Sequence, residues 1–69
     1  MQVGKITLAG ARVSKGLTQE EMARKMGVSR TLINMIETGN VEIKPHYLYA
    51  YCYITGFSVD DFLLPKKLT

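Results

Sequence analysis

The hydrophobic positions of this chain recur every three to four residues in five stretches, which is the period of an amphipathic helix. A glycine follows each of the first four stretches, as expected where a helix ends in the left-handed conformation. Alternation with a period of two is absent over any useful length, so we expect no β-sheet. The predicted helices cover residues 3–15, 18–26, 29–38, 45–55 and 58–64, and the glycines are Gly16, Gly27, Gly39 and Gly56.

Segment 17–39 carries the strongest local signals. Thr18 and Glu21 have the spacing of a capping box, in which hydroxyl and carboxylate satisfy backbone N–H groups at a helix start. Ser29, two residues after Gly27, can cap the next helix. A turn this short forces two helices to meet at a steep angle, as in a helix-turn-helix. That geometry holds the second helix away from the body, where it can enter the major groove of DNA.

The inward faces of the predicted helices define one small core. Such a core gives marginal stability, which dimerisation would increase. Pro45 suits the first turn of the fourth helix, and Ser58 with two aspartates caps the fifth. The predicted core residues are Leu8, Val13, Leu17, Met22, Ala23, Met26, Val28, Ile33, Ile36, Leu48, Tyr51, Cys52, Phe57, Phe62 and Leu63.

Composition narrows the class of protein. We expect the 69 residues to form one domain, and 46% hydrophobic with 22% charged residues is typical of a folded chain. The single cysteine, Cys52, excludes an internal disulfide framework and fits a cytoplasmic setting. The chain lacks an apolar signal region and a run near the roughly 20 residues of a membrane span. The net charge of +3 suits a polyanionic partner.

Catalytic and metal-binding patterns are absent from the sequence. There is no carboxylate pair, phosphate-binding glycine loop or metal-ligand spacing. His46 pairs with no nucleophile in a recognisable arrangement, and Cys52 is expected in the core. We therefore expect no enzyme activity, no cofactor, no metal and no small-molecule ligand.

The outward face of the predicted helix 29–38 has side chains suited to base edges. Arg30 can donate two hydrogen bonds to guanine, and Asn34 can pair with adenine. Thr31 or Met35 can contact a thymine methyl group. The alternative is an ordinary solvated helix face, because polar residues are the default at a protein surface.

Phosphate contacts are expected around the starts of the two helices and in the loop that follows them. Helix N-termini attract anions because their first backbone N–H groups are unpaired. The residues expected to bind phosphates are Thr18, Gln19, Ser29, Thr38, Asn40 and Lys44.

A set of spaced positions extends this motif: Arg12-(x)3-Gly16-Leu17-Thr18-Gln19-(x)3-Ala23-(x)3-Gly27-Val28-Ser29-(x)3-Ile33-(x)2-Ile36-Glu37-x-Gly39. The pattern resembles that of the Cro/C1-type (XRE-like) helix-turn-helix proteins, which include small repressors of temperate phages. The resemblance covers residues 6–64. It implies a compact bundle of four to five short helices, like the lambda-repressor DNA-binding domain, that binds operator DNA, commonly as a two-fold dimer.

The resemblance also assigns roles to single residues. The family's base-contacting positions fall on Arg30, Thr31 and Met35, with Asn34 nearby, and its phosphate-gripping glutamine falls on Gln19. Its partly buried ion pair falls on Arg12 and Glu37. The helical wheel supports that pair, because Glu37 shares the inward side with Ile33 and would be costly there without a cation.

Two features depart from the family pattern. Met35 stands where a polar residue is usual and has apolar Leu32 beside it, which favours shape-based DNA specificity or a protein partner on this helix.

Segment 47–54 contains no charged residue. Tyrosine is enriched in interfaces because it combines apolar area with a polar tip. We therefore expect Tyr47, Tyr49 and Tyr53, with the fifth helix, to form a self-association surface.

These observations predict an all-α domain with a short basic tail at 65–69. The expected function is sequence-specific binding of double-stranded operator DNA by a small transcriptional regulator, a phage or mobile-element repressor or Cro-like protein. It would act as a homodimer at the nucleoid in the cytoplasm, with recognition helices about 34 Å apart. The alternative is a protein-interaction module, an antirepressor or an antitoxin.

Overall fold

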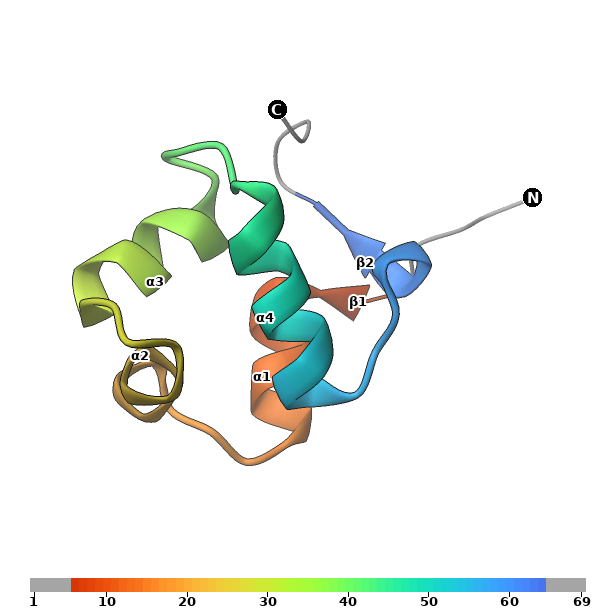
Figure 1. The fold of residues 1–69 in the computed structure, drawn as a ribbon, viewed down its shortest axis with the longest axis horizontal. Helices are drawn as coiled ribbons and strands as arrows, with labels where there is room; N and C mark the ends of the chain where they lie inside the picture. Colours follow the sequence, from red (N-terminus) through yellow and green to blue (C-terminus); the bar gives the residue numbers. More distant parts are fainter. Residues whose placement is uncertain (1–5, 65–69) are drawn as a thin grey trace.

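The computed structural model describes residues 6–64, and this part of the chain is mostly α-helical, as predicted. Four helices pack around one core, with a single 3-10 turn and two very short strands closing the bundle at one end (Figure 1). The elements in chain order are β1 (Ile6–Thr7), α1 (Leu8–Ser14), α2 (Gln19–Met26), α3 (Arg30–Thr38), α4 (Pro45–Thr55), η1 (Val59–Asp61) and β2 (Phe62–Leu63).

The turn between α2 and α3 forms as the sequence predicts. The Thr18 hydroxyl accepts from the backbone N–H of Glu21 at 3.0 Å, and the Glu21 carboxylate accepts from the N–H of Thr18 at 2.9 Å. Gly27 ends α2 with φ 72°, a conformation that costs other residues steric strain. The Ser29 hydroxyl then accepts from the N–H of Leu32 at 3.1 Å and starts α3.

The two terminal helices differ from the prediction. The helix expected at 3–15 begins at Leu8, because the Thr7 hydroxyl caps it by accepting from the N–H of Gly10 at 2.9 Å. Residues 3–5 of that expected helix, like the expected basic tail 65–69, lie outside the described residues. The helix expected at 58–64 is one 3-10 turn, closed where Asp61 accepts from the backbone N–H of Ser58 at 2.9 Å.

The expectation of no sheet was wrong. β1 and β2 pair in parallel, with Ile6 beside Phe62 and Thr7 beside Leu63. A strand of two residues is too short to produce an alternating pattern in the sequence. The pairing follows from packing, since the turn at η1 brings the buried Phe62 ring against the ring of Phe57, with the ring centroids 6.2 Å apart.

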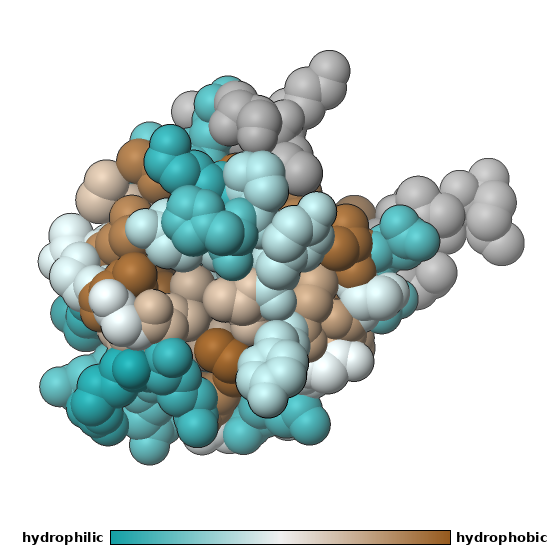
Figure 2. All heavy atoms as spheres, viewed as in Figure 1, coloured by the Kyte–Doolittle hydropathy of each residue, from teal (hydrophilic) through white to brown (hydrophobic). Residues whose placement is uncertain are grey.

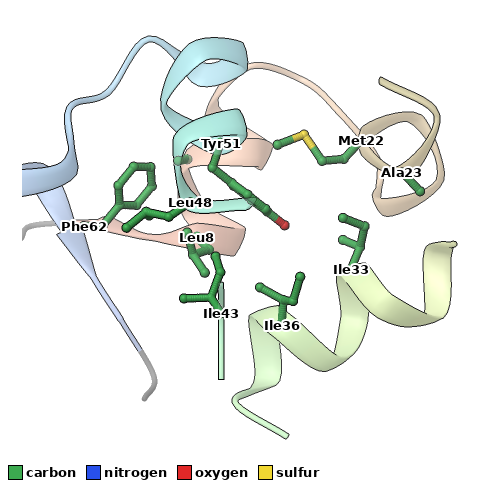
Figure 3. Close-up of a cluster of buried hydrophobic side chains, with 10 residues drawn as sticks. Leu8, Met22, Ala23, Ile33, Ile36, Ile43, Leu48, Tyr51 and Phe62 are labelled. Atoms are coloured by element: carbon green, nitrogen blue, oxygen red, sulfur yellow. The ribbon is translucent and has the colours of Figure 1, made fainter. Parts of the chain in front are cut away.

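The core lies between α4 and the other three helices (Figure 3). Tyr51 extends from α4 toward Ile33 and Ile36 of α3, and all three are fully buried. Phe62 and Leu48 pack at the end of the hydrophobic core that is farther from α3. The buried hydrophobic residues are Leu8, Ala11, Met22, Ala23, Ile33, Ile36, Ile43, Leu48, Tyr51 and Phe62.

Two predicted core residues are exposed. Val13 is 61% exposed, because it lies about 140° around α1 from the buried Leu8. Leu63 is 42% exposed, because successive side chains of a strand point to opposite faces and Phe62 points inward. Ala11 and Ile43 are buried instead, and the sequence analysis had missed both.

No helix among residues 6–64 has both the length and the apolar character needed to cross a bilayer.

Candidate nucleic-acid interface

α2 and α3 meet at a steep angle, and α3 lies at the edge of the molecule. In Figure 1, α2 is seen nearly end-on while α3 runs across the view. Ile33 and Ile36 fix one side of α3 in the core. The other side of α3 therefore faces away from the bundle, where a groove of DNA can receive it.

The residues predicted to contact bases lie on this outward side. Arg30, Thr31 and Asn34 are exposed. Met35 is half-buried but is not among the apolar side chains that pack against the core. Leu32 does pack against the core, so its apolar character has a structural cause. The outward face therefore combines three polar side chains with one flexible apolar side chain.

Glu37 lies at the centre of a buried network that joins all four α-helices. Its carboxylate accepts from Arg12 Nε at 2.8 Å and from Arg12 Nη2 at 3.1 Å, so the expected ion pair is present. Gln19 Nε2 donates to it at 3.2 Å, and the Tyr51 hydroxyl donates at 2.8 Å. The side chain of Glu37 is only 3% exposed. The network therefore fixes the orientation of α3 against α1, α2 and α4.

One further bond completes this network, and burial affects the pKa of one of its donors. Arg12 Nη1 donates to the carbonyl of Leu17 at 2.7 Å and so fixes the loop between α1 and α2. Burial, and secondly the bond to Glu37, raises the pKa of the Tyr51 hydroxyl, which keeps it a neutral donor. Sequence reasoning placed Tyr51 in the core but missed this bond. The inward helix position is its only signal, because the partners are 14 residues apart in the chain.

The side chain of Gln19 is already occupied within the protein. Its amide nitrogen donates to Glu37 and, at 3.3 Å, to Asn34 Oδ1. An amide nitrogen carries two protons, so none is left for a phosphate. Gln19 can still offer its backbone N–H, because it is the first residue of α2. The same bond holds Asn34, whose own amide nitrogen has no partner among the described residues.

The other residues predicted at phosphates divide into two groups. The Thr18 and Ser29 hydroxyls accept capping bonds, which leaves each O–H free to donate to a phosphate oxygen. Asn40 and Lys44 are exposed in the segment between α3 and α4. The Thr38 hydroxyl instead donates to the carbonyl of Asn34 at 2.8 Å, so its proton is used within α3.

The three tyrosines expected at one self-association surface do not share a face of α4. Tyr49 is 60% exposed and Tyr53 is 91% exposed. Tyr47 is half-buried and lines a hollow with Leu32 and Val41 on another side of the helix. The fifth helix, expected to extend the surface, is a single turn with Val59 42% exposed. The exposed part of the predicted surface is therefore the pair Tyr49 and Tyr53.

His46 and Cys52 show no arrangement for catalysis among the described residues. The His46 ring lies against the ring of Tyr47, with centroids 4.1 Å apart. Cys52 is half-buried at the edge of the core, and burial raises the pKa of its thiol, which disfavours the reactive thiolate.

α2 and α3 are both capped and are joined by a tight turn. A buried network holds α3 in place, and the outer face of α3 is polar. Together these features define a helix-turn-helix domain. A family model for helix-turn-helix proteins matches residues 8–62, which is most of the chain. The protein therefore belongs to the Cro/C1-type helix-turn-helix family, a family of DNA-binding regulators rather than enzymes. Comparisons with curated proteins and with solved structures gave no significant match.

Proposed function

We propose that this protein is a sequence-specific regulator that binds double-stranded operator DNA and acts as a phage or mobile-element repressor or Cro-like protein in the cytoplasm. The observation that carries this proposal is the outward face of α3, where Arg30, Thr31 and Asn34 are exposed beside the start of α2. The buried bonds of Glu37 hold that face in one orientation.

The side chains of α3 supply complementary chemistry for base edges. Arg30, at the first position of α3, can reach O6 and N7 of a guanine with two donors. The free amide nitrogen of Asn34 can donate to N7 of an adenine, while its oxygen accepts from the base amino group. Thr31 and Met35 offer methyl groups to thymine. Sequence preference would therefore come from few hydrogen bonds and from the shape of the groove.

Contacts to the phosphates would come from both ends of the motif. The unpaired N–H groups at the start of α2, with the Thr18 and Ser29 hydroxyls, would bind one strand. Asn40 and Lys44 would bind phosphates beyond the other end of α3. These contacts orient the domain on the duplex and do not depend on sequence.

Selection of bound duplexes from a random pool tests this function. We expect enrichment of a two-fold symmetric site with half-sites about one helical turn apart. Binding to the enriched duplex should weaken steeply with salt, because phosphate contacts release counterions. A pool without sequence enrichment after repeated rounds would contradict the proposal.

The alternative, a protein-interaction module such as an antirepressor or antitoxin, has one observation in its favour. Leu32, Ile36, Val41 and Tyr47 line an open hollow of about 380 Å³ beside the recognition helix. A protein partner seated there would cover the edge of α3. The same selection separates the two functions, since an interaction module would enrich no duplex.

We place the proposed dimer contact at Tyr49 and Tyr53. Sedimentation equilibrium should show a dimer at high concentration, and Tyr49→Glu should shift the mass to that of a monomer, because the carboxylate would be desolvated in the contact. Val13→Glu is a matched control, since Val13 is also an exposed apolar residue, 61% exposed, on α1. A wild-type monomer at all concentrations, with and without DNA, would disprove the dimer.

A further inference from the structure

A groove runs along the surface between α2 and the second half of α4, outside the proposed DNA-binding face. One hollow of about 390 Å³ is joined to another of about 660 Å³, because Lys25, Tyr53 and Ile54 line both. Figure 2 shows a strip of apolar side chains between the hydrophilic side chains over α2, at lower left, and the lower end of α4. We call this feature the α2–α4 groove, and its residues are Lys15, Leu17, Lys25, Met26, Ala50, Tyr53 and Ile54.

The floor of the α2–α4 groove is apolar. Leu17, Met26 and Ile54 are half-buried and pack against the core, which holds the floor in place. Tyr53 stands at the rim and is 91% exposed. So exposed a tyrosine beside an apolar floor is typical of a contact site, because it offers apolar area and a hydroxyl together.

The rim of the groove is basic on two sides. Lys25 projects from α2 and Lys15 from the loop after α1, and both are exposed. A Cβ atom added to Gly56 would lie 4.0 Å from Lys15 Nζ, so this ammonium group stands at the C-terminal end of α4. Within residues 6–64, neither lysine has a carboxylate within 4 Å. Two lysines that form no ion pair in this part of the chain therefore flank an apolar floor.

We infer that the α2–α4 groove binds an acidic amphipathic helical segment of a partner protein. Its apolar side chains, spaced at i, i+3, i+4 and i+7, would contact Leu17, Met26 and Ile54. Its carboxylates would pair with Lys15 and Lys25, which adds specificity and speeds association. No residue of α3 lines the groove, so the segment and DNA do not compete for the recognition helix.

The charges and shape favour this occupant over two others. DNA phosphates need donors and gain nothing from an apolar floor. A second copy placed groove to groove would bring the same lysines together, and like charges disfavour that contact. Tyr53 also belongs to the proposed dimer surface, so a docked segment would compete with the second copy for this side chain.

A designed peptide tests the inference. The probe is a 14-residue synthetic helix with leucine and phenylalanine at the apolar positions and glutamate elsewhere, titrated at a protein concentration where sedimentation shows a monomer. We expect saturable binding, with amide shifts in two-dimensional NMR clustered at Lys25, Ala50 and Ile54. The double variant Lys15→Glu with Lys25→Glu should bind at least about tenfold more weakly, because both cations become repulsive.

The matched control is Arg30→Glu with Lys44→Glu, the same charge change outside the groove, which should alter peptide affinity less than about twofold. Three outcomes would overturn the inference: no saturable binding at millimolar peptide, equal loss in both double variants, or shifts confined to α3. A self-association that only the groove variant abolishes would assign the groove to a second copy instead. Since peptide binding is measured without DNA, its failure leaves the proposed DNA-binding function unaffected.

Discussion

Replacing Glu37 by alanine should lower the free energy of unfolding by about 3–5 kcal/mol, because it leaves the buried Arg12 guanidinium without its partner. The Tyr51 hydroxyl and the Gln19 amide also lose their acceptor. A small domain has only about 5–15 kcal/mol of stability, so the variant would be close to unfolding. Urea denaturation followed by circular dichroism measures the change.

Two further variants test whether the loss of stability comes from the buried network or only from the removal of a negative charge. Glu42→Ala removes an exposed carboxylate and should change stability by less than about 0.5 kcal/mol. Joint replacement of Arg12 and Glu37 by leucine should cost less than Glu37→Ala alone, because no buried charge is left unpaired. Equal destabilisation by Glu37→Ala and Glu42→Ala would show that the network contributes nothing.

Replacing Arg30 by alanine should weaken binding to the selected duplex by about 10- to 100-fold, the effect of losing one bidentate contact to a guanine. Preference at one base position in each half-site should relax at the same time. Stability should stay unchanged, because Arg30 is exposed at the first position of α3 and has no ion pair among the described residues. Fluorescence anisotropy with matched and single-mismatch duplexes measures both effects.

Arg24→Ala provides the matched control for this prediction. Arg24 is also an exposed arginine, on α2, with its Nη1 3.8 Å from Glu20 Oε2, and it lies beside Leu17, Glu21 and Lys25 and not on the outward face of α3. Its loss should change affinity only through net charge, by a similar factor on every duplex. If Arg30→Ala leaves both the DNA affinity and the base preference unchanged, the proposed contact of Arg30 with a base is wrong.

The prediction of the motif from the sequence succeeded because its signals are local. The bonds of Thr18, Glu21 and Ser29 span three residues, and Gly27 needs only its own backbone freedom. The capping bonds and the glycine conformation each involve residues within about one helical turn, so the local sequence alone determines them. The pair of Arg12 and Glu37 was also within reach, since a carboxylate on an inward face requires a cation.

The sequence could not predict the features that depend on distant partners. Ile6 pairs with Phe62, and Tyr51 donates to Glu37, only because the packed helices bring these residues together. The same packing ended the fifth helix after one turn, by drawing Phe62 into the core.

The sequence by itself thus determined α2, α3 and α4, the turn between α2 and α3, and the polar face of α3, because steric and hydrogen-bonding preferences act over a few residues. Only the tertiary structure decided that both amide protons of Gln19 are used within the protein, and that two lysines flank an apolar groove. Both properties depend on which side chains of different helices and loops come into contact, and the packing of the folded chain determines those contacts.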